Sequence, residues 1–196
     1  MSKGRLEAFS DGVLAIIITI MVLELKVPKT AELDALRPLF PVFLSYALSF
    51  VFVAIYWNNH HHLLQAARHV NGSILWANLH LLFWLSLTPF VTAWMGQTCF
   101  AAWPVAAYGV VFLLAGFAYY ILSRALIAHH GHESALALAV GRDVKGKVSL
   151  VIYALAIPLA VVDFRIACAL YALAAVIWLV PDRRIETVLT EKRREM

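Results

Sequence analysis

The chain has 196 residues, of which 62% are hydrophobic and 14% are charged, and its mean hydropathy is +0.78. Soluble domains carry roughly 25% charged residues, so this composition excludes an ordinary soluble protein and favours a polytopic membrane protein with no room for a separate catalytic domain. The net charge of +4 could suit a nucleic-acid partner, but the positions of the basic residues matter more than their sum.

The uncharged apolar stretches predict an all-α fold with six transmembrane helices in one domain, residues 1–180. The expected spans are 6–26, 38–66, 73–95, 100–124, 147–162 and 165–180, followed by a basic cytoplasmic tail at 181–196. The first span is long enough only if it carries Asp11 into the membrane, a cost that sequences usually accept for function. The last two spans are separated by Asp163 and Arg165. One continuous helix there would measure about 50 Å, so a tight hairpin fits better.

The basic residues predict the orientation of these spans. With the N-terminus inside, the outer side receives four of the sixteen Lys and Arg residues, which are Lys26, Lys29, Arg37 and Arg165. The other twelve fall on the cytoplasmic side: Lys3, Arg5, Arg68, Arg124, Arg142, Lys145, Lys147, Arg183, Arg184, Lys192, Arg193 and Arg194. The positive-inside rule then predicts a multi-pass protein of the cell membrane with both termini in the cytoplasm.

A charge-free stripe runs along the first span. At 100° per residue, Ile16, Thr19, Ile20 and Leu23 lie within about 60° of Ile16, whereas Asp11 lies about 140° away. Such a stripe can face lipid, neighbouring helices or an ion path, and the periodicity alone does not choose among them.

Polar residues of the first three spans are expected at one level near the cytoplasmic boundary. Ser10 and Asp11 of the first span, His60 or His61 of the second and Asn78 of the third fall at similar heights at 1.5 Å per residue. An unpaired carboxylate at membrane depth is costly. We therefore predict a structural polar layer in which these side chains hydrogen-bond to one another.

The sequence favours neither metal binding nor catalysis. The three consecutive histidines at 60–62 are 100° apart on a helix and cannot converge on one ion, and the histidines at 129–132 are expected in a solvated loop. Cys99 and Cys168 lack the paired spacing of a metal site or a disulfide framework. No GxSxG, HExxH or P-loop motif occurs. We expect no metal, no cofactor and no enzyme activity.

Three motifs resemble one known family. Arg5-x-x-x-Phe9-Ser10-Asp11, followed by an isoleucine-rich helix, resembles the signature of the endosomal/lysosomal potassium-channel family of the transmembrane protein 175 type. Trp57-x-x-His60-His61 in the second span is similar to that family, and so is Asn78-Leu79-x-Leu81-Leu82-Phe83 with Pro89-Phe90 in the third. The resemblance covers roughly residues 5 to 90, and nothing distinctive follows Thr98.

The resemblance implies a potassium-permeable cation channel of the leak type with modest preference for K⁺ over Na⁺. Animal members carry two six-helix repeats and this chain has one, so it is similar to prokaryotic members that form a homotetramer around the first helices. The pore-facing isoleucine of the family lies five residues after the aspartate of the motif, which is Ile16 here, and Thr19, Ile20 and Leu23 follow on the same stripe. Asp11 would then face away from the pore and lock the first helix to its neighbours.

A proton-coupled secondary transporter is the alternative. Asp11 and His60 would then form a proton relay instead of a structural lock. Transporters usually show broken helices and repeated halves, and neither is visible in the sequence.

Overall fold

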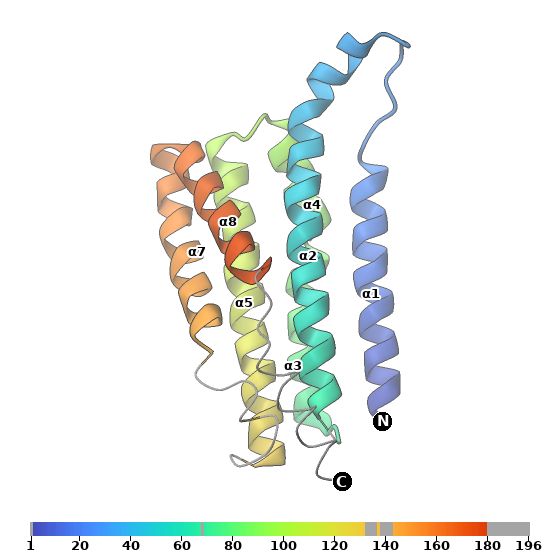
Figure 1. The fold of residues 1–196 in the computed structure, drawn as a ribbon, viewed down its shortest axis with the longest axis vertical. Coiled ribbons are helices and arrows are strands. Elements are labelled where there is room, and N and C mark those ends of the chain that lie inside the picture. Colours follow the sequence, from blue (N-terminus) through green and yellow to red (C-terminus); the bar gives the residue numbers. More distant parts are fainter. Residues whose placement is uncertain (1, 68, 132–136, 138–142, 180–196) are drawn as a thin grey trace.

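The computed structural model describes residues 2–67, 69–131, 137 and 143–179, and within them the chain is an all-helical bundle (Figure 1). The helices in chain order are α1 (Lys3–Leu23), the 3₁₀ helix η1 (Leu33–Leu39), α2 (Phe40–Ala66), α3 (Gly72–Ser86), α4 (Thr88–Gln97), α5 (Ala102–His130), α7 (Val144–Val162) and α8 (Phe164–Leu179). Five segments are long and apolar enough to cross a membrane, namely α1, η1 with α2, α3 with α4, α5 and α7, and α8 is a shorter apolar helix. The predicted all-α membrane fold is confirmed.

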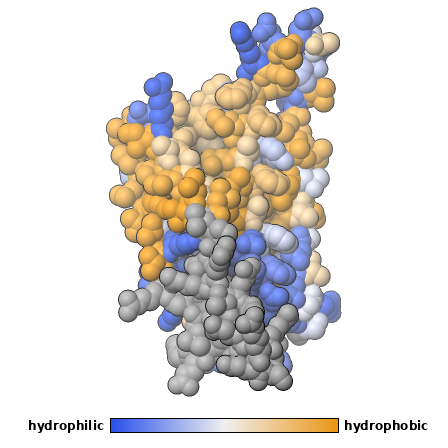
Figure 2. Space-filling view, viewed as in Figure 1, coloured by the Kyte–Doolittle hydropathy of each residue, from blue (hydrophilic) through white to orange (hydrophobic). Residues whose placement is uncertain are grey.

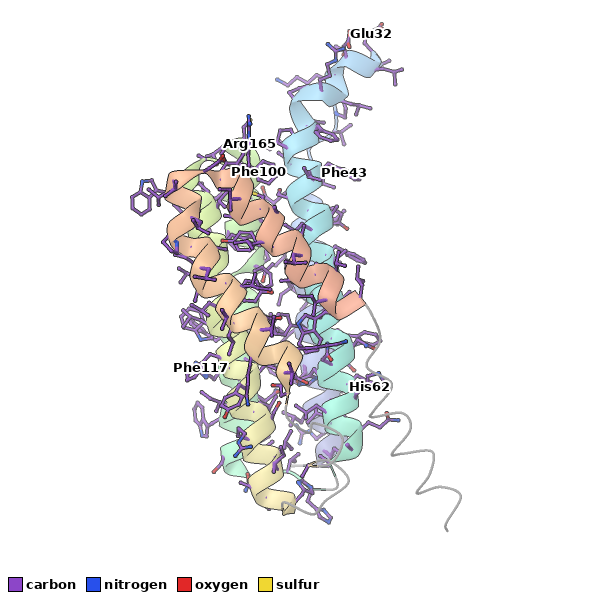
Figure 3. The ribbon with its side chains drawn as sticks, turned by 60° about the vertical axis from the view of Figure 1, so that its left-hand side comes forward. Glu32, Phe43, His62, Phe100, Phe117 and Arg165 are labelled. Carbon is purple, nitrogen blue, oxygen red and sulfur yellow. The ribbon has the colours of Figure 1, made fainter. Side chains whose placement is uncertain are left out.

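The surface has the polarity of a membrane protein. Figure 2 shows hydrophobic residues across the middle of the visible face, with hydrophilic residues gathered toward its two ends. Glu32 and Arg165 lie toward one end, whereas His62 lies in the opposite half (Figure 3). Seven of the twelve basic residues predicted on the cytoplasmic side, at 68, 142, 183, 184 and 192–194, lie outside the described residues, as does the tail at 181–196.

The two ends of α1 are attached to different helices. Near its start, Lys3 Nζ donates to the backbone oxygen of Gln65 at the end of α2, at 3.3 Å. Beyond its end, Gln97 Nε2 of α4 donates to Glu24 Oε2 at 3.4 Å. Helix α1 therefore runs antiparallel to α2, which lies next to it in Figure 1.

The third predicted span, 73–95, consists of two helices. Helix α3 ends at Ser86 and α4 begins at Thr88, with Leu87 between them. Pro89 explains the break, because proline has no backbone N–H and its ring clashes with the carbonyl of the residue four positions earlier, here Leu85. The Leu87 N–H donates to the Trp84 oxygen at 3.2 Å, and the Val91 N–H donates to the Leu87 oxygen at 3.2 Å, so hydrogen bonding resumes at once on either side.

The hairpin predicted around residues 163–165 is present. Asp163 is the one residue between α7 and α8, its backbone is extended, and its Oδ1 accepts a hydrogen bond from the backbone N–H of Arg165 at 2.9 Å.

At the other end of the bundle, α5 continues to His130, beyond residue 124 where the sequence predicts its end. His129 and His130 are therefore the last residues of α5 and not loop residues, and His130 Nε2 accepts from the backbone N–H of His69 at 3.2 Å.

Small residues bring the helices close together. Ala115, Ala118, Ala156, Ala160, Ala167 and Ala174 are almost fully buried, as expected where membrane helices pack through short side chains. Gly96 of α4 lies against α2 so tightly that a Cβ there would stand 2.7 Å from Val42 Cα. Helix α5 packs against α3, α4, α7 and α8, whereas the main contacts of α1 are with α2, α3 and α4. More than half of the residues of α1 are exposed, so one side of this helix is uncovered.

Candidate functional site

Helix α1 has one buried face and one exposed face. The buried face contains Leu6, Ser10, Leu14, Ile17 and Met21. The stripe predicted from the sequence lies on the exposed face, where Ile16 is 59%, Ile20 is 44% and Leu23 is 75% exposed, and Thr19 is exposed beside them. Ile17, only one residue from Ile16, is 3% exposed. The 100° rotation between successive residues therefore separates the two faces sharply.

Thr19 gives this exposed face its hydroxyl. Its Oγ1 donates to the backbone oxygen of Ala15, one turn earlier, at 2.9 Å. Because the hydroxyl proton is used within the helix, the oxygen lone pairs remain available to accept or to coordinate a cation. The exposed face thus combines apolar side chains with one hydroxyl oxygen that can accept a hydrogen bond.

A chain of hydrogen bonds holds the buried face. His60 Nε2 on α2 donates to Asn78 Oδ1 on α3 at 2.7 Å, and Asn78 Nδ2 donates to Ser10 Oγ on α1 at 3.0 Å. Ser10 Oγ in turn donates to the Leu6 oxygen at 2.9 Å. Ser10 and Asn78 are fully buried and His60 is 2% exposed, so these bonds form in an apolar interior where an unpaired polar group would be costly. These hydrogen bonds join α1, α2 and α3 at one place, the three-helix junction.

Asp11 does not belong to this buried chain, contrary to the expectation of one polar layer. It is exposed, and its Oδ1 accepts a hydrogen bond from Trp57 Nε1 of α2 at 3.0 Å. The Trp57 ring stacks on His61, with centroids 5.9 Å apart. Adjacent residues on a helix point 100° apart, so only one of Ser10 and Asp11 can enter the core, and the smaller Ser10 does.

The remaining predicted residues lie outside these two clusters. Arg5 is exposed on α1, and Phe9 is 50% exposed. Among the described residues, Asp11 bonds to Trp57 and His60 bonds to Asn78, and no hydrogen bond joins Asp11 to His60. Within the described residues, no group of three or more His, Cys, Asp or Glu side chains is arranged to hold a metal ion.

A second buried polar cluster was not predicted from the sequence. Thr92 Oγ1 of α4 donates to Ser49 Oγ of α2 at 2.7 Å, and Ser49 Oγ lies 3.2 Å from the Tyr108 hydroxyl of α5. The available signal was a pair of hydroxyl residues four positions apart in each span, Ser45 with Ser49 and Thr88 with Thr92. Such pairs share one helix face and hydrogen-bond across membrane helices.

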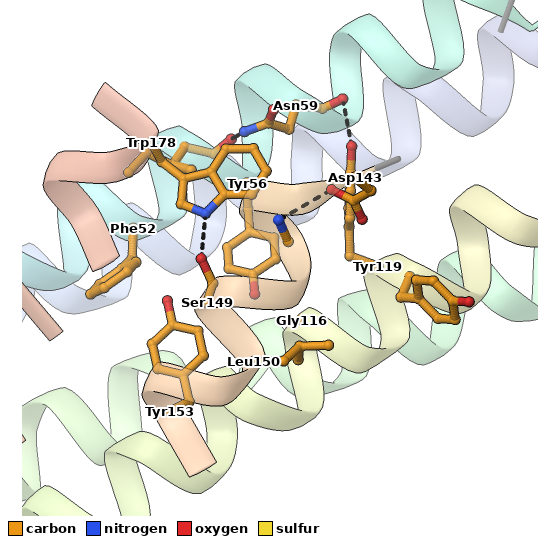
Figure 4. A pocket seen from close by; sticks show the side chains of 13 residues that line it. Phe52, Tyr56, Asn59, Gly116, Tyr119, Asp143, Ser149, Leu150, Tyr153 and Trp178 are labelled. Atoms are coloured by element: carbon orange, nitrogen blue, oxygen red, sulfur yellow. Dashed lines mark hydrogen bonds between the residues drawn. The ribbon is translucent and has the colours of Figure 1, made fainter. Parts of the chain in front are cut away.

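A small cavity lies elsewhere in the bundle, away from α1. It measures about 40 Å³ and lies between α2, α5, α7 and α8, with Tyr56, Tyr119 and Tyr153 in its wall (Figure 4). Trp178 Nε1 donates to Ser149 Oγ at its edge, at 2.8 Å. One water molecule needs roughly 10–15 Å³ of such volume, so this cavity has room for a few water molecules. None of its described lining residues comes from α1, which separates it from the exposed stripe.

The chain is similar to known channels. A profile of the family described as endosomal/lysosomal potassium channel TMEM175 matches residues 5–89. A potassium channel from Chryseobacterium sp. is 54% identical over 191 residues, which cover 97% of this chain and all of the relative. A potassium channel from Streptomyces collinus is 36% identical over 99 residues, 48% of each protein. The crystal structure of a lysosomal potassium-selective channel TMEM175 homolog from Chamaesiphon minutus has a TM-score of 0.79 and 26% identity, covering 91% of this chain and 96% of that one.

Replacing Asn78 tests whether the buried hydrogen bonds hold α1. In Asn78→Ala, the His60 N–H loses its acceptor inside the core, so we expect the free energy of unfolding to fall by roughly 1–3 kcal/mol. Asn59→Ala is the matched control, because among the described residues the Asn59 amide donates to Ile55 of its own helix, at 2.7 Å, and to no other helix. The measurement is the thermal unfolding midpoint of the two purified variants in detergent. Equal losses in both would contradict a special role for the three-helix junction.

Proposed function

Because the chain belongs to the endosomal/lysosomal potassium channel TMEM175 family, as its motifs between residues 5 and 90 predict, we propose that it is a leak-type, potassium-permeable channel of the cell membrane. The observation that carries the proposal is the uncovered, charge-free face of α1, with Ile16 59% and Leu23 75% exposed in the single protomer. Potassium ions are the permeating ligand, and the proposal requires no resident cofactor and no enzyme activity.

One helix cannot enclose an ion path, so the proposal includes a homotetramer with four α1 helices around its axis. Asp11 supports assembly on this side of the protomer. It lies about 12 Å along α1 from Lys3 and is exposed, and a carboxylate facing lipid at membrane depth is strongly disfavoured. Neighbouring copies would replace lipid beside Asp11 and leave the stripe centred on Ile16 facing the axis.

The constriction in this proposal is apolar. Rings of Ile16, Ile20 and Leu23 narrow the path and disfavour water, so an ion must shed part of its hydration shell to pass. Potassium loses water more readily than sodium does. The Thr19 oxygens, whose protons are bonded to Ala15, would supply part of the lost coordination. Hydroxyl oxygens and dewetting together favour potassium modestly, which is why we propose weak selectivity.

The proposed orientation has both termini in the cytoplasm. Its basis is the twelve-to-four distribution of basic residues in the full sequence, which places the α1–α2 connection outside. A reporter enzyme that is active only outside the cytoplasm, fused after Met196, is expected to remain inactive. The same reporter inserted at Thr30 is expected to be active. The reverse pattern would invert the proposed topology.

Ion flux tests the function directly. In proteoliposomes with a potassium gradient opposed by sodium, we expect a reversal potential displaced toward the potassium equilibrium potential but short of it, because the selectivity is modest. The purified complex should have the mass of four 21.8 kDa chains in mild detergent. Protein-free vesicles are the control. Absence of a potassium current, or conduction by a strictly monomeric protein, would contradict the proposal.

Ile16 and Ile17 form a matched pair of variants, one on each face of α1. Ile16→Ser removes bulk from the proposed constriction and adds hydroxyls, so we expect higher conductance and weaker preference for potassium. Ile17→Ser places a hydroxyl in the core, where Ile17 is 3% exposed, so we expect near-native permeation and a loss of roughly 2–5 kcal/mol of stability. Single-channel conductance, reversal potential and thermal unfolding are measured for both. An unchanged conductance and selectivity in Ile16→Ser would exclude this helix face from the ion path.

A further inference from the structure

Glu24 lies where the exposed stripe of α1 ends. It caps the C-terminus of the helix, directly after Leu23 and one turn beyond Ile20. Ile20 and Glu24 line the same open groove, together with Phe90, Trp94 and Gln97 of α4. Ile20 is the stripe residue that lines this groove, so the groove joins the last turn of the stripe to α4, with a carboxylate at its end.

The position of this carboxylate is set by a contact, and its charge is left uncompensated. Gln97 Nε2 donates to Glu24 Oε2 at 3.4 Å, which draws the side chain toward α4. The ion pairs among the described residues are Lys3 with Glu7 and Arg37 with Asp34, so no described cation pairs with Glu24. A negative charge at a helix C-terminus is also repelled by the partial negative charge of the helix dipole. Among the described residues, neither an ion pair nor the helix dipole favours a negative charge here.

Resting on the proposed tetramer, we propose that four Glu24 side chains form an acidic ring at the pore mouth and raise the local concentration of monovalent cations. Glu24 lies about 6 Å beyond Ile20 and about 12 Å beyond Ile16 along the helix axis. It therefore stands outside the apolar constriction, where water is present and an ion keeps its hydration shell. Rings of carboxylates act in this way in cation channels, since they attract the permeating ion without binding it tightly.

The salt dependence of conductance separates this role from a structural one. The Debye length is about 30 Å at ~10 mM salt and about 3 Å at ~1 M, so the attraction of the ring is felt at low salt and screened at high salt. We expect the potassium conductance of Glu24→Gln to be roughly two- to threefold below that of the parent at ~10 mM KCl, and equal to it at ~1 M. Glu24→Asp, which keeps the charge, should behave as the parent does.

Glu32→Gln is the matched control, because it removes the same charge from an exposed acid at the tip of the structure (Figure 3). It should conduct as the parent does at both salt concentrations. Equal conductance of Glu24→Gln and the parent at low salt would overturn the acidic ring and leave the channel proposal intact. A deficit of the same size at both salt concentrations would also overturn the ring, because screening would have no effect. A parent without potassium current would instead overturn the proposed function itself.

Discussion

A chain of hydrogen bonds inside the apolar core determines how α1 is rotated, and the rest of the candidate site depends on that rotation. Ser10, Asn78 and His60 come from three helices and are almost fully buried. In a medium without water, each of these groups needs a partner, so the junction has few alternatives. A rotation of α1 by one residue would turn Ser10 out of the junction and bring Ile16 toward the core in place of Ile17.

Contacts among α2, α3 and α4 support this orientation of α1. Among the described elements, α2 and α4 approach at Gly96, and Thr92 and Ser49 bond between them at 2.7 Å. The break at Leu87 divides the third span into α3, which supplies Asn78 to the junction, and α4, which supplies Gln97 to Glu24. Each half of the broken span therefore contacts a different part of α1.

The polar groups of α1 have different environments along its length. Near its start, Asp11 accepts a hydrogen bond from Trp57 on the exposed side. The middle of the exposed face has only apolar side chains and Thr19, whose proton is used within the helix. At the end, the Glu24 carboxylate accepts from Gln97, and no cation in the described part of the chain forms an ion pair with it. Asp11 therefore lies off the exposed stripe, and in the proposed pathway the apolar segment supplies the dehydration barrier while Glu24 alone supplies attraction at the mouth.

The sequence by itself determined the fold class and the composition of the exposed stripe. Apolar stretches of sufficient length must be helical in a bilayer, because every backbone group needs an internal partner, and the 3.6-residue period then assigns Ile16, Thr19, Ile20 and Leu23 to one face. Ser10, His60 and Asn78 were recognised as polar groups at one height for the same reason. Only the tertiary structure decided which of the neighbours Ser10 and Asp11 enters the core. That outcome depends on Asn78 and Trp57, which lie 68 and 46 residues away in the chain, and no local periodicity contains their distance and direction.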